Sequence, residues 1–161
     1  MQREITLVFE EFSSLDDLNR EQQELARAAI EARNKAYAPY SRFNVGAAVA
    51  LASGKIESGS NKENASFPAG TCAERNVLNY VHDRFPGDTI LKLAISAHPE
   101  TFEVNEPLAP CGICRQVICE VEKIQDSPIE IIMLSNDGRA VVVGSGKDLL
   151  PLHFYLPQLK K

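Results

Sequence analysis

The segment Asn44-Val45-Gly46-Ala47-Ala48-Val49-Ala50-Leu51 carries no polar side chain after its first residue. An uninterrupted apolar run of this length predicts a strand that is buried in a sheet. Ser53-Gly54 is a turn signal, so we expect Lys55–Ser60 to pair back onto that strand as a second one. After a loop that contains Pro68 and Gly70, the chain should form a helix over Cys72–Arg84.

Strands and helices continue to alternate on both sides of this segment. Upstream, apolar residues that recur every three to four positions predict a helix over Asp16–Ala36, and Leu7-Val8-Phe9 has a strand-like composition. Downstream, the same kinds of signal predict strands over 90–97, 129–134 and 140–143, a helix over 111–123, and a short helical turn after Pro151.

This alternation predicts an α/β fold, a three-layer α/β/α sandwich built around a mixed sheet of roughly five strands. The sheet should be mixed because the tight turn at Asn136-Asp137-Gly138 would make the last strand pair antiparallel. The 161 residues fit one compact domain and are too few for two ordinary ones, so we expect residues 1–161 to form a single domain.

The composition excludes several classes of partner. The formal net charge is −5 and the isoelectric point is about 5.2, whereas proteins that bind nucleic acid usually present a basic face. No apolar run reaches 18 residues, and the segment Met1–Ile5 lacks the apolar core of a signal peptide. We therefore expect a cytoplasmic protein with no nucleic-acid or membrane partner, in which four cysteines indicate metal binding or catalysis before disulfides.

Three of the cysteines fall at the starts of two predicted helices. Cys72 lies in Thr71-Cys72-Ala73-Glu74-Arg75, and the other two lie in Pro110-Cys111-Gly112-Ile113-Cys114-Arg115-Gln116. Each helix follows a strand and a loop, which places both helix N-termini along one edge of an open α/β sheet. Unpaired N–H groups and positive potential at a helix N-terminus favour thiolate over thiol. Three thiolates there predict a zinc site with one open position, as in catalytic zinc sites.

Two other uses of these cysteines have to be weighed. A closed four-cysteine site would need Cys119, but that residue is rotated by roughly 140° from Cys114 around the helix and should point away from the metal. Cys111-Gly112-Ile113-Cys114 alone could be a redox pair. The Cys72-Ala73-Glu74 element disfavours this, because Cys-x-Glu followed by Pro-Cys-x-x-Cys is the three-cysteine signature of zinc deaminases, with the glutamate as proton shuttle.

Several segments together resemble the cytidine deaminase family in its small, homotetrameric, three-cysteine zinc class. The resemblance runs from about Glu21 to Phe154 and departs from the shorter members in two places, the N-terminal extension of residues 1–20 and a longer loop around His98–Glu106. The segments that carry it, in order, are Tyr40–Ala48, Asn61–Phe67, Thr71–Arg75, Pro110–Gln116 and Leu149–Phe154.

The resemblance implies a hydrolase of pyrimidine salvage that deaminates cytidine and deoxycytidine to uridine and deoxyuridine with release of ammonia. The attacking group would be a zinc-bound hydroxide, and Glu74 would shuttle the protons. Further roles follow by the same resemblance: zinc on Cys72, Cys111 and Cys114, ring stacking by Phe43, ribose binding by Asn61 and Glu63, a bond from Arg75 to the thiolates, and approach of Phe154 to a neighbouring subunit's site in the tetramer.

Some alternatives stay open from the sequence alone. Thr71 and Glu74 fit a capping box, Thr-x-x-Glu, in which Glu74 only stabilises the helix start. The zinc chemistry could act on another nucleoside, such as a nucleoside antibiotic. The chain could also be a non-enzymatic, zinc-stabilised binding module, which a turnover assay would distinguish from a deaminase.

Overall fold

The computed structural model of the chain describes residues 1–155. Its strands are β1 (Phe9–Phe12), β2 (Phe43–Leu51), β3 (Ile56–Ser60), β4 (Ile90–Pro99), β5 (Glu130–Leu134) and β6 (Ala140–Val143). Its α-helices are α1 (Arg20–Arg33), α2 (Ala73–Arg84), α3 (Gly112–Gln125) and α4 (Gly146–Leu149), and 3-10 turns lie at Leu15–Asp17 and Phe67–Ala69. None of the helices in this part of the chain is both long and apolar enough to cross a membrane.

The six strands form one mixed sheet in the order β1-β6-β5-β4-β2-β3. Only β4 and β5 are neighbours in parallel, and the remaining neighbouring pairs are antiparallel, including the β5–β6 pair that the Asn136-Asp137-Gly138 turn predicts. The mixed α/β sheet is thus confirmed. The sixth strand is β1, in which Phe9 pairs with Val143 and Phe12 with Ala140, so part of the N-terminal extension completes one sheet edge.

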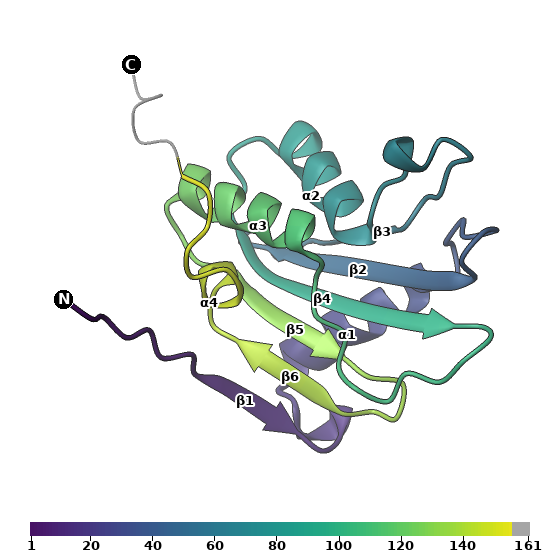
Figure 1. Cartoon of the computed structure of the whole chain (residues 1–161), viewed down its shortest axis with the longest axis horizontal. Coiled ribbons are helices and arrows are strands. Elements are labelled where there is room, and N and C mark those ends of the chain that lie inside the picture. Colours follow the sequence, from purple (N-terminus) through teal and green to yellow (C-terminus); the bar gives the residue numbers. More distant parts are fainter. Residues whose placement is uncertain (156–161) are drawn as a thin grey trace.

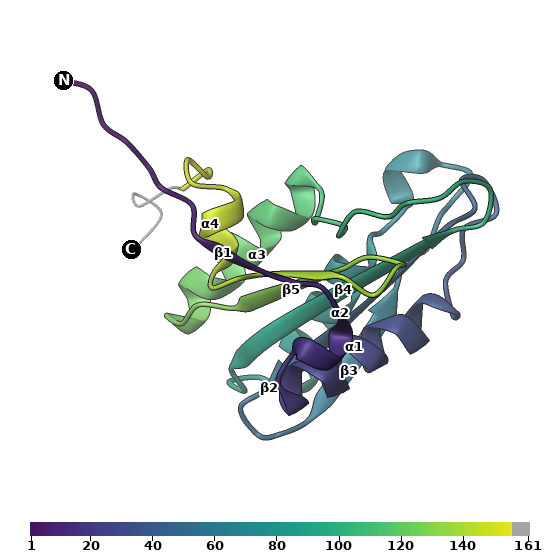
Figure 2. The same ribbon diagram turned by 90° about the horizontal axis from the view of Figure 1, so that it is seen from below.

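Helices cover both faces of the sheet, as the three-layer prediction requires. In Figure 1, α2, α3 and α4 lie in front of the strands and α1 lies behind them. The edge-on view in Figure 2 shows α3 and α4 on one side of the sheet and α1 on the other. The layers are joined by two crossovers that cover the same face, from β3 through α2 to β4 and from β4 through α3 to β5.

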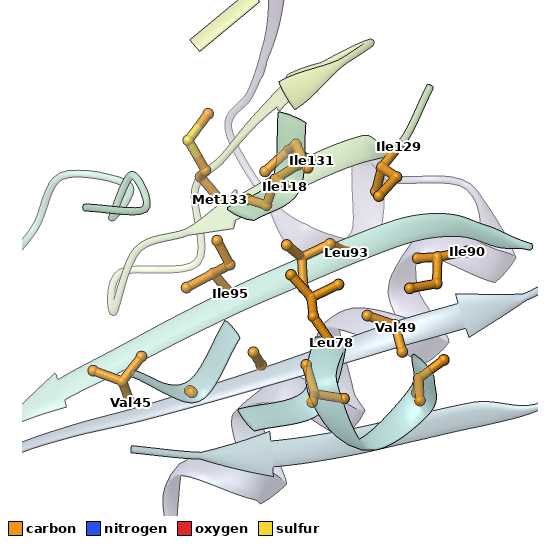
Figure 3. Close-up of a cluster of buried hydrophobic side chains, with 14 of the residues drawn as sticks. Val45, Val49, Leu78, Ile90, Leu93, Ile95, Ile118, Ile129, Ile131 and Met133 are labelled. Atoms are coloured by element: carbon orange, nitrogen blue, oxygen red, sulfur yellow. The ribbon is translucent and has the colours of Figure 1, made fainter. Parts of the chain in front are cut away.

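Alternate residues of the central strands fill two separate apolar clusters. In β2, Val45, Ala47 and Val49 face α2 and α3, whereas Ala48 faces α1. Figure 3 shows the larger cluster, in which Leu78 of α2 and Ile118 of α3 pack onto side chains of β2, β4 and β5. Both faces of β2 are apolar because helices cover the sheet on both sides, and successive side chains of a strand point to opposite faces.

The helix α1 starts later and ends earlier than the sequence predicts. Asn19 and Gln22 form a capping box, with bonds of 3.0 and 3.1 Å between each side chain and the other residue's N–H, so the helix begins after Asn19. Residues 15–17 make a separate 3-10 turn. Beyond Arg33, the N–H groups of Lys35 and Ala36 bond three residues back instead of four, which ends the α-helix.

The segment after β6 is held against α3. The buried carboxylate of Glu122 accepts hydrogen bonds from the N–H of Gly146 at 2.7 Å, the N–H of Ile129 at 2.8 Å and the hydroxyl of Ser145 at 2.9 Å. Because Ser145 also accepts from the N–H of Lys147, the short helix α4 begins at this point. The predicted helical turn after Pro151 is therefore misplaced, since the helix precedes that residue and residues 151–152 form only a turn.

Candidate metal centre and cavity

The starts of α2 and α3 meet at one edge of the sheet, as the sequence predicts. Both β3 and β4 run antiparallel to β2, so these two strands end at the same edge. Each is followed by a loop and then a helix, with Cys72 as the N-cap of α2 and Cys111 as the N-cap of α3. Neither cysteine caps its helix through a side-chain hydrogen bond, so first-turn N–H groups remain to favour thiolate.

The sulfurs of Cys72, Cys111 and Cys114 form a compact cluster. The Cys111 Sγ lies 3.5 Å from that of Cys114 and 4.0 Å from that of Cys72, and all three lie within 4.8 Å of one another. A tetrahedral zinc with Zn–S distances of about 2.3 Å needs sulfurs roughly 3.8 Å apart. The three thiol groups therefore fit one zinc ion as ligands, and with three protein ligands the fourth coordination position stays open.

The thiols of the cluster differ in how readily they lose a proton, and zinc would bind all three as thiolates. A hydrogen bond from the Cys114 thiol, opposed by burial, lowers the pKa of Cys72 to about 6. The same bond, together with burial, raises the pKa of Cys114. The fourth cysteine, Cys119, is buried outside the cluster, and burial and the nearby Glu122 carboxylate raise the pKa of its thiol. The expectation that Cys119 points away from the metal is confirmed.

Glu74 is a buried carboxyl group at the second position of α2, with 4% of its surface exposed. Burial raises its pKa, and hydrogen bonds from its own backbone N–H and from the Cys114 thiol, together with the Arg75 charge, oppose that rise. The capping-box interpretation is wrong, because Cys72 and not Thr71 is the N-cap, and no side-chain bond closes the helix start. Glu74 is thus available for chemistry and is not engaged in capping.

Arg75 is half-buried beside this cluster. In residues 1–155 the structure shows no hydrogen bond from its guanidinium to a sulfur, so the predicted bond to the thiolates is not made here. Its positive charge still lowers the pKa of both Cys72 and Glu74. The side chain therefore favours the charged forms of these two groups through electrostatics.

An open cavity of about 800 Å³ lies over the cluster. Its walls contain most of the residues singled out from the sequence, namely Phe43, Asn61, Glu63, Cys72, Glu74, Arg75 and Cys111. The sequence reasoning missed a set of apolar residues in the same walls, Tyr40, Phe67, Leu108 and Ile113. Tyr40, Phe67 and Ile113 lie within the segments that carry the family resemblance, and this position in the sequence could have identified them as cavity residues.

Asn61 and Glu63 reach the cavity because hydrogen bonds join the two ends of the loop between β3 and α2. Two backbone hydrogen bonds of 2.9 Å join Lys62 and Thr71 and bring Glu63 close to Cys72. The Asn61 side chain donates to the Phe43 carbonyl and accepts from the Val45 N–H, both at 2.9 Å.

The Glu63 carboxylate accepts from the backbone N–H groups of Tyr40 at 2.8 Å and Ser41 at 3.2 Å, and its pKa is lowered, chiefly by a bond from the Ser41 hydroxyl. One carboxylate oxygen carries both backbone bonds. These two side chains therefore support the turn and the strand that carry Phe43, and each retains hydrogen-bonding capacity toward the cavity.

Phe43 and Phe154 occupy different environments. Phe43 is the first residue of β2, packs against the larger core cluster and lines the cavity. Phe154 does not line it. Its backbone N–H and carbonyl bond to the side chain of Gln116 in α3 at 3.1 and 3.0 Å, and the residue is 68% exposed.

Comparison with known proteins connects this site to a family. The family model described as "Cytidine and deoxycytidylate deaminase zinc-binding region" matches residues 19–130. A protein of Halalkalibacterium halodurans named cytidine deaminase is 37% identical over 131 residues, which is 81% of this chain and 92% of that protein.

Solved structures agree with this result. A crystal structure of cytidine deaminase from Burkholderia pseudomallei is 38% identical, covers 85% of this chain and all of its own, and superposes with a TM-score of 0.72. One from Mycobacterium tuberculosis is 33% identical, covers 86% of this chain and all of its own, and gives a TM-score of 0.66. The match over most of the chain, together with the three-cysteine zinc site, shows that this chain belongs to the family of zinc-binding cytidine and deoxycytidylate deaminases.

Proposed function

We propose that this chain catalyses the hydrolytic deamination of cytidine and deoxycytidine to uridine and deoxyuridine, with release of ammonia. The observation that carries the proposal is the buried Glu74 carboxyl, which lines the same cavity as Cys72 and Cys111 and stands two residues from the first zinc ligand. The two relatives that are 37% and 38% identical carry the name cytidine deaminase, which supports a pyrimidine nucleoside as the substrate class.

Glu74 is the group that moves protons in this proposal. When bound, zinc supplies the Lewis acidity that makes water a nucleophile near neutral pH. Glu74 accepts a proton from the water that attacks C4 and delivers it to N3 of the ring. It then takes the proton of the new hydroxyl group on C4 and passes it to the departing amine, so that C4 becomes a carbonyl and ammonia leaves. Burial raises the pKa of Glu74, and a carboxyl whose pKa moves toward the working pH is a better proton donor in the later steps.

The remaining cavity residues hold the substrate. The Phe43 ring would stack on the pyrimidine, and Asn61 and Glu63 would bond the ribose hydroxyls with their remaining donor and acceptor positions. Their bonds to the backbone of residues 40–45 fix the two side chains before substrate arrives. Fixed groups lose little conformational entropy when the substrate binds. Arg75 would offset the negative charge that three thiolates place around one Zn²⁺.

The test of this function is a turnover assay with a panel of substrates. Cytidine and deoxycytidine should release ammonia, and free cytosine should be a much poorer substrate because it lacks the ribose that Asn61 and Glu63 would bind. Lost hydrogen bonds to a charged group cost about 1.5–3 kcal/mol each, or roughly ten- to a hundredfold. Equal kcat/KM values for cytosine and cytidine would refute the proposal that Asn61 and Glu63 bind the ribose. If no nucleoside were turned over, the proposed deaminase activity would be refuted.

Assembly into a homotetramer is part of the proposal. Phe154 is exposed and lies outside the cavity of its own chain. Gln116 bonds only its backbone, so the ring is available to contact a neighbouring site. Exposed apolar side chains at the cavity rim, Phe67 at 76% and Ile113 at 63%, offer a surface for a second copy.

Phe154→Ala should therefore lower kcat/KM for cytidine by about tenfold, the range expected when a buried aromatic contact is lost. Tyr80→Ala, which removes an exposed aromatic ring on α2, is the matched control and should leave kcat/KM within about twofold of the parent. Sedimentation reports the oligomer, and a monomer with full activity would contradict the assembly.

The location and the domain organisation are proposed on separate grounds. The four cysteines are free thiols, and three of them serve as metal ligands, which suits a reducing compartment such as the cytoplasm. A single domain is supported by β1, which adds residues of the N-terminal extension to the same sheet as the other strands.

A further inference from the structure

The loop between β4 and α3 runs from Glu100 to Cys111, and hydrogen bonds anchor it at two places. At its start, the N–H of Glu100 bonds the Arg42 carbonyl at 3.0 Å, and the Glu100 carboxylate accepts from the Asn44 amide at 2.9 Å. These bonds tie the loop to the start of β2. Figure 1 shows the loop extending beyond the end of β4.

The far end of the loop is tied to the turn between β5 and β6. The Asn136 amide donates to the Val104 carbonyl at 3.2 Å, and the Arg139 guanidinium donates to the Asn105 carbonyl and pairs with the Glu106 carboxylate at 3.5 Å. These contacts hold the intervening residues 101–103 beside the start of β2.

The residue held in this way is Phe102. Its ring stacks on that of Phe43, with centroids 6.1 Å apart and an angle of 15° between the planes, within the range of attractive aromatic pairs. Phe102 does not line the cavity, whereas Phe43 does. Phe43 therefore contacts the apolar core, lines the cavity and stacks on the Phe102 ring.

We propose that Phe102 is a positioning residue for substrate binding, which acts by fixing the orientation of the Phe43 ring against the pyrimidine. This inference rests on the proposed function, since it assigns Phe43 to the base. A ring at a strand end that packed only on the core could still tilt on its cavity side. A second ring stacked on it restricts that motion before substrate arrives, and such restriction lowers the entropic cost of binding.

The test is Phe102→Ala in the full chain, assayed with cytidine. KM should rise about three- to tenfold with kcat within about twofold, because stacking on the base contributes equally to the ground state and the transition state. Phe102→Tyr keeps the ring and should restore KM. Glu103→Ala, which changes an exposed side chain in the same loop, should match the parent in both constants. Melting curves report folding, and since Phe102 is 54% exposed they should hardly move.

A double-mutant comparison shows whether Phe102 acts through Phe43. In a Phe43→Leu background, Phe102→Ala should raise KM less than about twofold, because the ring that it orients is gone. An undiminished rise in that background would mean direct contact with substrate and would overturn the inference. An active parent whose KM is unchanged by Phe102→Ala, with or without a lower melting temperature, would overturn the inference and leave the proposed function intact. A parent that turns over no nucleoside would overturn both.

Discussion

Cys111→Ala should abolish both stoichiometric zinc binding and turnover of cytidine. Cys111 is the central member of the three-cysteine cluster, since its sulfur lies 3.5 Å from that of Cys114 and 4.0 Å from that of Cys72. The loss of activity should be at least about a thousandfold, because without the metal the pKa of water returns from about 7 toward 15.7. Cys111 is exposed, so the substitution removes a ligand without opening a hole in the core.

The matched control for this experiment is Cys119→Ala. Cys119 lies on the same helix as Cys111 but is buried outside the cluster, so the variant should keep about one zinc per chain. Metal analysis and activity are measured together for both proteins. Zinc removal from the parent by a strong chelator should reproduce the Cys111→Ala phenotype, and added zinc should reverse it. Full activity in zinc-free protein would contradict the mechanism.

Glu74→Gln is expected to lower turnover by at least about a hundredfold, because general acid–base assistance is typically worth 10²–10⁴-fold and an amide cannot relay a proton. Glutamine has nearly the same shape as glutamate. Glu74 is not among the clustered ligands, so zinc content should stay at that of the parent. The melting temperature should stay equal or rise, because a neutral amide is cheaper to bury than a carboxylate in a site that already raises the pKa of Glu74.

The informative result is the combination of these three measurements. A turnover lowered at least about a hundredfold, with normal zinc content and a melting temperature that has not fallen, assigns the proton shuttle to Glu74. If Glu74→Gln retained most of the parent's activity, the proton would have to move through another group, and the mechanism proposed for the family site would be wrong for this chain. Capping of α2 offers no alternative explanation, since Cys72 occupies the N-cap.

The features that were predictable from the sequence depend on local patterns. A few neighbouring residues were enough to predict three features: the apolar strand β2, the start of α2 after Cys72 and the start of α3 after Cys111. The structure confirms all three. The three-cysteine cluster followed, because helices that succeed strands ending at one edge of a sheet must begin near one another.

The features that the sequence analysis missed depend on long-range contacts. The strand-like composition of Leu7-Val8-Phe9 was visible in the sequence, but not that Phe9–Phe12 pairs with the free edge of β6 as a sixth strand. Helix α4 begins where the distant Glu122 carboxylate accepts the Gly146 N–H. The pairing of Phe102 with Phe43 needs anchors at Asn136 and Arg139, more than thirty residues further along the chain. Periodicity and composition contain no information about such partners.

The bonds of Glu122 have a consequence for shortened forms of the protein. Removing the residues that follow β6 would take away the Ser145 hydroxyl and the Gly146 N–H, two of the three groups that bond the Glu122 carboxylate in residues 1–155, and would uncover this part of α3. Losing two hydrogen bonds to a charged group costs about 3 kcal/mol or more, a large part of the 5–15 kcal/mol that typically separates folded from unfolded domains. A nonsense mutation late in the gene would thus act through proteolysis of unfolded chains, before any effect on catalysis came into play.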